Sequence, residues 1–426
     1  MTISELANSL SSGAMDGLFS QIYHKNDREK LRQRARYLNA AENFSKHFPQ
    51  CNDIHILSAP ARVEIGGNHT DHQHGKILAA AVTSDILAIF AVNSENIIRI
   101  YSEGYGIMEI NLSDLSDIAI EKGTWTALVR GIISGFSKKQ RTITGFDAYI
   151  TSDIPVGCGL ASSAAFEVLL GKIISYCSRF NSDTVEIAKI GQYAESEFNE
   201  KNCGLMDQLL CLTGGIAAID MKNPENPLIE KVNFDFSDSG YTLCIVDTGS
   251  SHENYSNEYD NIVSDMKSVS EILNVKYLRD ADDEYFYSNI AEIRRKCSDS
   301  AVLRAMHFFA ENHRAEEERI CLESGCFDEF LKLVNESGDS SAMLLRNVFS
   351  VKNPEIQPVM VAVAVSRLFL KGSGAVRVHG GGFGGTILAI VPDYMVNGYI
   401  NALDTVFGEG STHIMSIRNS GAKLLY

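Results

Sequence analysis

A glycine-rich loop at residues 155–165 is the stretch of this sequence best suited to holding a phosphate group. It reads Pro-Val-Gly-Cys-Gly-Leu-Ala-Ser-Ser-Ala-Ala, between a strand-like segment and an alanine-rich helical segment. Glycines let the backbone turn tightly and approach a ligand, and the following helix points its N–H groups and positive end at the same place. The hydroxyls of Ser162 and Ser163 could bind a phosphate oxygen or Mg²⁺. The alternative is a helix N-cap made of small residues, because serine is a common N-cap.

A second glycine motif, Gly380-Gly-Gly-Phe-Gly-Gly385, has the spacing G-x-G-x-x-G. A dinucleotide-binding fold needs a helix directly after that motif. Residues 386–391 read Thr-Ile-Leu-Ala-Ile-Val, which predicts a strand instead. The motif therefore predicts a strand–turn–strand element and argues against a nicotinamide-dependent dehydrogenase. A glycine hairpin without a ligand is the alternative.

The segments that must position these motifs predict a mixture of helices and strands. Strands are expected at 54–58, 77–92, 97–101, 145–151, 215–220, 241–247, 374–378 and 386–391. Helices are expected at 27–48, 125–136, 162–178, 184–198, 206–212 and 357–370, and the region 255–347 is helix-rich. The mixture indicates an α+β fold with two domains. The proline-containing loop 223–227 marks the expected boundary between them.

The composition is that of an ordinary globular protein with an acidic surface. The 426 residues suggest two or three domains, and the net charge is −16 without a run of five like charges. Nucleic acid binding is disfavoured because a phosphate backbone needs clustered lysine and arginine. The nine cysteines show no regular disulfide pattern, and neither a signal peptide nor a membrane span is recognisable. We therefore expect a cytoplasmic monomer or homodimer that binds neither nucleic acid nor membranes.

Four ordered motifs resemble those of the GHMP kinases and, within them, those of the galactokinases. Ala59-Pro-Ala-Arg-Val-Glu-Ile-Gly-Gly-Asn-His-Thr-Asp71 resembles the signature G-R-V-N-L-I-G-E-H-T-D, and Cys203-Gly-Leu-Met-Asp-Gln208 resembles C-G-I-M-D-Q. The loop 155–165 is similar to P-x-G-x-G-L-x-S-S-A-A, and the late glycine motif is similar to G-G-G-F-G-G. The order and approximate spacing also agree. The resemblance covers the chain from about residue 59 to its end.

The resemblance implies a two-domain GHMP kinase fold of the α+β class. The N-terminal domain, expected at residues 51–225, would contain a mixed sheet like that of ribosomal protein S5. The C-terminal domain, expected at residues 226–426, would combine an antiparallel sheet with helices, and the active site would lie in the cleft between the two. Residues 1–50 fall outside the resemblance and are expected to form a helical extension packed on the main body.

The resemblance also implies which residues carry phosphoryl transfer. Asp207 matches the catalytic aspartate that faces the anomeric hydroxyl of the sugar, and Arg62 matches the arginine beside it. A neighbouring arginine would keep the aspartate ionised and stabilise charge on the γ-phosphate of ATP. Ser163 and Glu195 match the Mg²⁺ ligands, and both supply the oxygen atoms that Mg²⁺ requires.

The phosphates of ATP are expected over the first glycine loop, and Trp125 matches an aromatic residue near the adenine. For Trp125, which is the only tryptophan, plain core packing is the alternative. The residues expected to bind ATP are Pro155, Gly157, Gly159, Leu160, Ser162, Ser163, Ala164 and Trp125.

The residues expected to bind the sugar are Asn68, His69, Asp71, Gly204 and Tyr259. Asn68 stands where the family has a glutamate that accepts hydrogen bonds from the sugar, and an amide differs by carrying two donors and no charge. His72 replaces the usual tyrosine, and the basic residues that often follow the family's tyrosine are missing after Tyr259. These departures leave the identity of the sugar open.

The sequence therefore predicts an ATP-dependent sugar kinase with galactose as the leading substrate and Mg²⁺ as the metal ion. One alternative is a GHMP kinase that acts on a different sugar or polyol. Another is a catalytically silent sugar and ATP sensor, which the presence of all four catalytic and metal-binding residues disfavours. The cluster His69-Thr-Asp-His-Gln-His74 matches no standard zinc spacing. His72 and His74 are expected to line the rim of the sugar pocket or to face solvent.

Overall fold

Two β-sheets organise the chain in the computed structural model, which describes residues 1–23, 27–115, 123–155, 157–200, 203–250 and 255–426. The first sheet has the strand order β12-β1-β2-β5-β3-β4, with a β6–β7 hairpin also attached to β2. Among the strands of the described residues, β3 and β5 alone pair in parallel. Its strands are β1 (His55–Gly66), β2 (Lys76–Val92), β3 (Ile97–Ser102), β4 (Gly106–Asn111), β5 (Phe146–Ser152), β6 (Ile216–Asp220), β7 (Leu228–Val232) and β12 (Lys423–Leu424).

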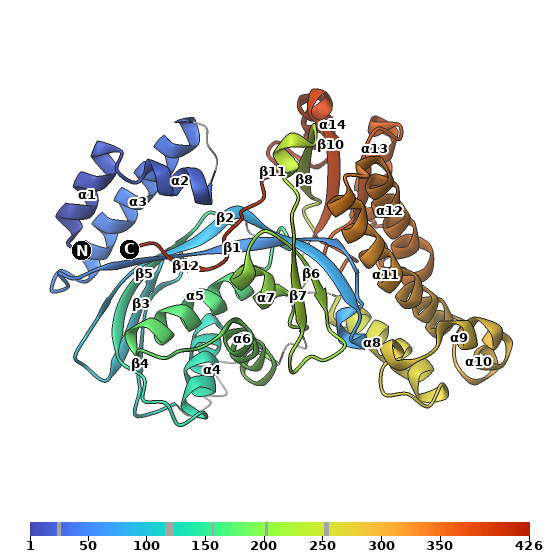
Figure 1. Ribbon diagram of the computed structural model, residues 1–426, viewed down its shortest axis with the longest axis horizontal. Helices are drawn as coiled ribbons and strands as arrows, with labels where there is room; N and C mark the ends of the chain where they lie inside the picture. The colour runs from blue at the N-terminus through green and yellow to red at the C-terminus, as the bar shows by residue number, and fades with distance from the viewer. Residues whose placement is uncertain (24–26, 116–122, 156, 201–202, 251–254) are drawn as a thin grey trace.

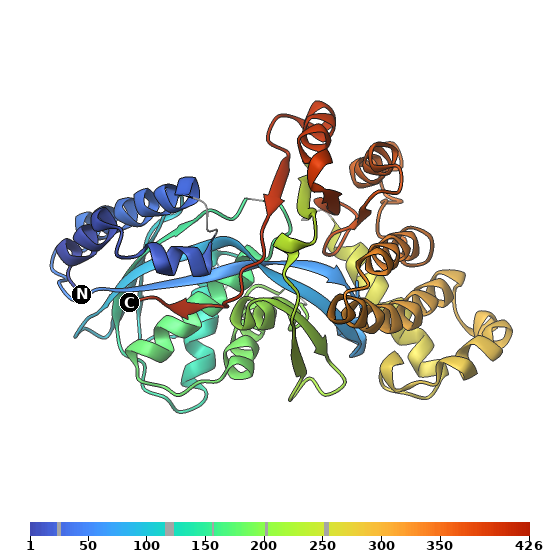
Figure 2. The same cartoon turned by 45° about the horizontal axis from the view of Figure 1, so that its top comes forward.

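The long antiparallel pair of β1 and β2 connects the two halves of the molecule. Figures 1 and 2 show both strands running from the N-terminal helices into the second half. Alternate side chains of β1 point to opposite faces, as strand geometry requires. The odd-numbered set from Leu57 to Ile65 joins the main core. Four helices of the first half contribute to this core: α4 (Trp125–Ser137), α5 (Ser162–Cys177), α6 (Thr184–Phe198) and α7 (Met206–Thr213).

The N-terminal helices cover the opposite face of the same sheet (Figure 2). Phe19, Tyr37 and Phe44 from these helices form a second core with apolar side chains of β1, β2 and β5. The N-terminal helices therefore form a layer packed on the first sheet. Its helices are α1 (Ile3–Ser12), α2 (Asp16–Ile22) and α3 (Asp27–His47).

The second half contains an antiparallel sheet of order β11-β8-β10-β9 and most of the long helices. Helices α13 (Pro358–Leu370) and α14 (Val396–Phe407) pack on one face of this sheet. The strands are β8 (Tyr241–Asp247), β9 (Ala375–Val378), β10 (Thr386–Pro392) and β11 (Thr412–Met415). The other helices are α8 (Ser256–Ile272), α9 (Asp283–Ser288), α10 (Ile290–Lys296), α11 (Asp299–Ser324) and α12 (Phe327–Ser340).

The first sheet extends beyond the domain boundary expected from the sequence. Residues 225 and 226 lie in the loop between β6 and β7, which pair with each other in that sheet. The C-terminal strand β12 also returns to pair with β1. Strands β7 and β12, which fall within the residues expected to form the C-terminal domain, therefore belong to the first sheet. Within the described residues, none of the helices is long and apolar enough to span a membrane.

Candidate active site

An ion pair between Arg62 and Asp207 forms the centre of the candidate site. Arg62 is part of β1, and Asp207 is in the first turn of α7. Nε of Arg62 donates to Oδ1 of Asp207 at 2.7 Å and Nη2 donates to Oδ2 at 2.8 Å. Burial disfavours the charged guanidinium, but the charge of Asp207 outweighs this and raises the pKa of Arg62. The paired contacts fix the carboxylate plane, while 31% of the Asp207 side chain stays exposed.

The first glycine loop is attached directly to this pair. Nη1 of Arg62 donates to the carbonyl oxygen of Gly159 at 2.6 Å, and the Arg62 backbone N–H donates to that of Leu160 at 3.2 Å. Gly157 and Gly159 have φ values of 79° and 62°, which favour glycine. A Cβ on Gly157 would meet no atom within 4 Å, so this part of the loop borders open space. The N–H groups at the start of α5 are thereby placed beside Arg62.

The second glycine motif lies against the first. Oγ1 of Thr386, at the start of β10, donates to the carbonyl oxygen of Cys158 at 3.1 Å. A Cβ on Gly380 would lie 4.0 Å from the carbonyl oxygen of Gly159. The two motifs are more than 200 residues apart in the sequence, and the predicted strand–turn–strand element at 375–392 brings them together. The second motif therefore borders the candidate site as a turn between β9 and β10.

Asp71 and Gly204 meet on the other side of Asp207. Asp71 begins the short 3₁₀ turn Asp71–Gln73, which follows β1. A Cβ on Gly204 would lie only 1.6 Å from Oδ2 of Asp71, so a glycine is needed there. Burial, and then the negative charge of Asp207, raises the pKa of Asp71 to about 6. Two carboxylates thus lie close together next to a single arginine.

His69 and Tyr259 both contact the second glycine motif. Nε2 of His69 lies 2.9 Å from the carbonyl oxygen of Gly381, and the Tyr259 hydroxyl donates to that of Gly382 at 2.9 Å. The two rings are 6.2 Å apart, with 22° between their planes. Burial lowers the pKa of His69 to about 4, so its ring is neutral. Because a carbonyl oxygen can only accept, Nε2 carries the proton and donates it to Gly381.

The ring nitrogens of His72 are turned away from solvent, contrary to one of the two expectations for this residue. Both ring nitrogens of His72 are buried and have no hydrogen-bond partner among the described residues. Burial lowers the pKa of His72 to about 3, so the side chain is neutral and does not face solvent. His74 stacks on Tyr277, with ring centroids 3.5 Å apart. The described part of the chain contains no group of three or more metal-ligating side chains that could hold a metal ion.

Asn68, which was expected to bind the sugar, is buried within the protein. Only 1% of this residue is exposed. Its Nδ2 donates to Oε1 of Glu64 at 2.8 Å and to the carbonyl oxygen of Gly380 at 2.7 Å. Its Oδ1 accepts from Nδ2 of Asn347 at 2.8 Å. Both donor hydrogens and one acceptor site are therefore used by the protein itself, which leaves little capacity for a ligand.

The residues expected to hold Mg²⁺ lie on neighbouring helices. Ser163 is in the first turn of α5, and Glu195 is in the last turn of α6, which packs on α5. Glu195 is buried. It lies close enough to Cys203 that its charge, after burial, raises the pKa of the Cys203 thiol. A hydroxyl and a buried carboxylate are oxygen donors of the kind that suits Mg²⁺. The donor chemistry therefore fits the ion.

The remaining expected residues are also placed by the structure. Trp125 is the first residue of α4, packs against the main core and lies 6.2 Å from the ring of Tyr105. Ser162 begins α5 and is exposed, whereas Leu160 and Ala164 are buried. Val156 of the first loop and residues 251–254 before Tyr259 lie outside the described residues.

Two features of the site were missed by the sequence analysis. Gln208 donates from Nε2 to Oε2 of Glu167 at 2.8 Å, so the residue next to Asp207 joins α7 to α5. Arg377 is fully buried and donates from Nη2 to Oε1 of Glu64 at 2.8 Å. Gln208 could have been found because it belongs to a quoted motif. Arg377 gave no local signal, since its partner is 313 positions away.

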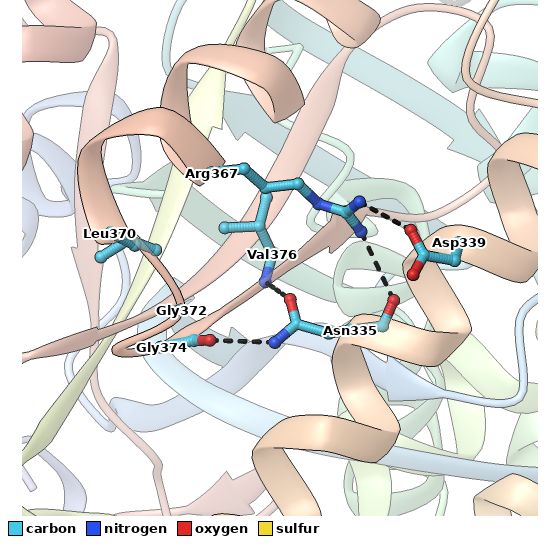
Figure 3. A pocket seen from close by; sticks show the side chains of 7 residues that line it. All are labelled: Asn335, Asp339, Arg367, Leu370, Gly372, Gly374 and Val376. Carbon is cyan, nitrogen blue, oxygen red and sulfur yellow. Dashed lines mark hydrogen bonds and ion pairs between the residues drawn. The ribbon is translucent and has the colours of Figure 1, made fainter.

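A surface hollow of about 260 Å³ lies away from this site, between α12, α13 and the start of β9 (Figure 3). Arg367 donates to Asp339 at 2.6 Å, and Asn335 bonds the backbones of Gly374 and Val376. These polar groups therefore satisfy one another and brace α12 against the sheet. None of the predicted site residues lines the hollow.

Comparison with known proteins identifies the family. The sequence model of the GHMP kinases N terminal domain matches residues 127–215, and that of the galactokinase galactose-binding signature matches residues 42–92. A galactokinase from Glaesserella parasuis is 31% identical over 362 residues, which cover 83% of this chain and 89% of the relative. This chain belongs to the galactokinase family. The family membership confirms the resemblance found in the four motifs.

Other members of the galactokinase family match over similar lengths. A galactokinase from Clostridium acetobutylicum is 29% identical over 400 residues, which cover 89% of this chain and 96% of the relative. A crystal structure of Lactococcus lactis galactokinase complexed with galactose superposes with a TM-score of 0.78 at 22% identity, covering 90% of this chain and 98% of that one. A mevalonate kinase structure reaches 0.60 at 18% identity, covering 86% and 99%. These likenesses confirm the expected α+β GHMP kinase fold.

Proposed function

We propose that this chain is an ATP-dependent sugar kinase that phosphorylates the anomeric hydroxyl of galactose. The observation that carries the proposal is the two-point contact between Arg62 and Asp207, with the same guanidinium bonded to Gly159 of the first glycine loop. A carboxylate, a fixed positive charge and a phosphate-binding loop are thus held at one place. Phosphoryl transfer requires this combination, because its catalysis consists mainly of positioning and charge stabilisation.

In the proposed mechanism, the phosphates of ATP lie over the first glycine loop and the start of α5. Asp207 orients the anomeric hydroxyl and accepts its proton as the oxygen attacks the γ-phosphorus. Arg62 keeps Asp207 in position and stabilises negative charge on the transferring group. Ser163 and Glu195 would hold Mg²⁺, which supplies positive charge at the phosphates when bound. The products are ADP and a sugar 1-phosphate.

On the sugar side, we assign hydrogen bonds with sugar hydroxyls to Asp71, with His69 and Tyr259 beside it. Once it is ionised, Asp71 is the best hydrogen-bond acceptor of these three side chains. It also lies next to Asp207, where the sugar is proposed to react. His69 donates its ring N–H to the carbonyl oxygen of Gly381, so its role is to shape the pocket together with Tyr259. Among the described residues, none of the nine cysteines forms a disulfide, and a reducing compartment such as the cytoplasm would suit such a protein.

A kinase for a sugar other than galactose is a second candidate, and Asn68 favours it. The family uses a glutamate at this position to accept hydrogen bonds from the sugar, whereas the Asn68 side chain is committed to Glu64, Gly380 and Asn347. A hydroxyl that depends on that glutamate would lose its partner here. The sugar accepted by this chain could therefore differ from galactose at that hydroxyl.

The test is release of ADP from ATP and Mg²⁺ in the presence of single sugars, with galactose first and with glucose, N-acetylgalactosamine, mannose and arabinose as comparisons. We expect the highest kcat/KM with galactose. Release of ADP with another sugar but not with galactose would transfer the assignment to that sugar. If ADP is released no faster with any sugar than with ATP alone, the kinase proposal is wrong. A protein that only binds sugar and ATP is then the better interpretation.

A further inference from the structure

Two residues of β1 and its following turn occur in exchanged order compared with the family signature. The signature G-R-V-N-L-I-G-E-H-T-D has asparagine and glutamate four positions apart, and this chain has Glu64 and Asn68 at the same two places. Either change alone would alter the charge and hydrogen bonding of the turn. Together they preserve one amide and one carboxylate.

The two exchanged residues contact each other inside the protein. Nδ2 of Asn68 donates to Oε1 of Glu64 at 2.8 Å, and both residues are buried. An amide can donate and an ionised carboxylate can only accept, so this bond forms in either order of the two residues. Two glutamates at these positions would instead place two acceptors within hydrogen-bond distance. Such a pair is strongly unfavourable away from water.

The exchanged order also provides a donor at position 68 that a glutamate would lack. The second N–H of the Asn68 amide donates to the carbonyl oxygen of Gly380 at 2.7 Å. Asn347 completes the junction by donating to Oδ1 of Asn68 at 2.8 Å and to the carbonyl oxygen of Gly381 at 3.1 Å. The turn that carries His69 and Asp71 is thereby joined to the second glycine motif.

The charge of Glu64 is balanced from the second half of the chain. Arg377 is fully buried and donates to Oε1 of Glu64 at 2.8 Å and to the carbonyl oxygen of Ile65 at 2.6 Å. Oε1 of Glu311 lies 3.9 Å from Nη1 of Arg377. Burial raises the pKa of Glu64, and the positive charges of Arg377 and then Arg62 oppose that shift. A buried carboxylate at position 64 is tolerable because these cations surround it.

A third departure in the same turn has its own partner. Gly66 stands where the signature has isoleucine, and a Cβ on Gly66 would lie 1.7 Å from Oε2 of Glu318 on α11. The side chain of Glu318 therefore occupies the space that the isoleucine would need. All three departures are thus matched by residues of the second half, which indicates that the turn and the second half fit one another as a set.

We propose that Glu64 and Asn68 are an exchanged acceptor and donor pair, with Arg377 as the counter-ion, and that Asn68 is a positioning residue. Asn68 holds the turn of His69 and Asp71 against the second glycine motif, and it does not bind the sugar. The sugar-binding part of this inference rests on the proposed kinase function. The pairing itself is independent of that function, so the two can be tested separately.

The pairing is tested by comparing the thermal unfolding of Asn68→Glu, Glu64→Asn and the double variant without any substrate. Asn68→Glu buries two carboxylates together, and we expect Tm to fall by about 5 °C. The double variant restores one amide and one carboxylate, so it should recover at least half of that loss. A double variant whose loss equals or exceeds the sum of the single losses overturns the pairing.

Exposed Asn39 on α3 provides the matched control, since Asn39→Glu makes the same chemical change outside the pair. Its Tm should stay within about 1 °C of the unchanged protein. If Asn68→Glu yields no folded protein while the double variant folds, the pairing is supported. If neither folds, Glu64→Gln and Asn68→Ala are combined in the same way, and losses that add without coupling count against the pairing.

The role of Asn68 as a positioning residue is tested with Asn68→Ala and a set of deoxy sugars. A displaced turn should lower kcat/KM by about 100-fold. The factor should be the same for the preferred sugar and for each analogue that lacks one hydroxyl. A direct sugar contact predicts instead that one analogue, the one without the contacted hydroxyl, is insensitive to the substitution. That second pattern would refute the positioning role. A wild-type protein without sugar kinase activity would refute the proposed function and leave the unfolding test intact.

Discussion

At the scale of single residues, the geometry around Asp207 distinguishes the residue proposed for phosphoryl transfer from the loop proposed to bind ATP. Arg62 contacts both oxygens of Asp207 and also Gly159, so the carboxylate is oriented by the same group that borders the phosphate loop. Asp207 lies in α7 and is not part of the loop expected to hold ATP. A change at Asp207 should therefore affect phosphoryl transfer far more than nucleotide affinity.

Asp207→Asn keeps the size and planarity of the side chain and removes its ability to accept a proton. We expect kcat to fall by at least about a thousandfold, while the affinity for ATP, measured by calorimetry, changes less than about threefold. Asp27→Asn at the exposed start of α3 is the control and should leave both unchanged. Turnover of Asp207→Asn within about tenfold of the wild type would remove Asp207 from its catalytic role.

Asp71 gives the site a pH dependence of known sign. Its pKa is raised to about 6 by burial and by Asp207. The folded protein therefore favours the protonated form. The contribution of protonated Asp71 to folding stability is fully present below the usual aspartate pKa near 3.8 and is lost as the pH rises through about 6. Ionised Asp71 suits the sugar-binding role proposed for it and is costly for folding, so activity and stability should change in opposite directions across this range.

Asp71→Asn removes the cost of ionisation. We expect its Tm to exceed that of the wild type by about 2 °C at about pH 8 and to equal it at about pH 4. In the wild type, kcat/KM for the sugar should rise with pH through about 6, and in Asp71→Asn it should be low at every pH. Thermal unfolding and initial rates across this range measure both effects. A Tm difference that grows toward low pH would contradict the assignment.

At the scale of elements, the turn between β9 and β10 serves as a wall of the site. Gly381 and Gly382 accept from His69 and Tyr259 through their carbonyl groups, and Gly380 lies beside the first glycine loop. Three segments far apart in the sequence therefore depend on how closely this turn approaches them. The close approach requires glycine, since side chains would occupy the space of the neighbouring groups.

Gly381→Ala tests this close approach. The added Cβ would lie 2.5 Å from Cε1 of Tyr259, so the tyrosine ring must move away from the turn. We expect kcat/KM to fall by about 100-fold with a small change in Tm. Gly17→Ala in α2 is the control, because its added Cβ meets no atom within 4 Å. Wild-type kinetics in Gly381→Ala would show that the position of Tyr259 does not matter.

At the scale of the whole molecule, one buried carboxylate joins both ends of the chain to the first sheet. Asp85 on β2 is completely buried and accepts from Arg36 of α3 at 2.6 Å and from Arg418 near the C-terminus at 3.0 Å. The hydroxyls of Tyr23 and Ser58 also donate to it. The N-terminal helices and the C-terminal segment are therefore held by a shared charge as well as by their apolar contacts.

Asp85→Asn leaves the fully buried Arg418 without its carboxylate, and it removes one of the two carboxylates beside the partly buried Arg36. We expect a loss of about 3 kcal/mol in the free energy of unfolding, measured by denaturant titration, and a kcat close to that of the wild type in the remaining folded protein. Arg34, whose pair with Asp16 is partly exposed, supplies the control, because Arg34→Gln should lower the free energy of unfolding far less than Asp85→Asn does. Equal losses in the two variants would show that burial of Asp85 has no special effect.

The local sequence determined the elements and the chemistry of the motifs. Helices such as 184–198 and 206–213 and strands such as 241–247 agree with their expected positions, because apolar periodicity and glycine placement act over a few residues. The family motifs named Arg62 and Asp207, and the structure joins them by two hydrogen bonds. The strand after Gly385 was also correctly expected from its β-branched run.

Only the tertiary structure decided which polar groups are used up inside the protein. Asn68 reads as a sugar ligand in its motif, yet its partners Gly380 and Asn347 come from segments about 280 to 310 positions away. The two ring nitrogens of His72 are buried although the motif is polar, and Arg377 carries no local signal at all. The place of β12 in the first sheet was hidden for the same reason, since β12 pairs with β1 from the other end of the chain. Hydrogen-bond capacity and burial depend on which distant segments the fold brings together, and no single segment of sequence contains that information.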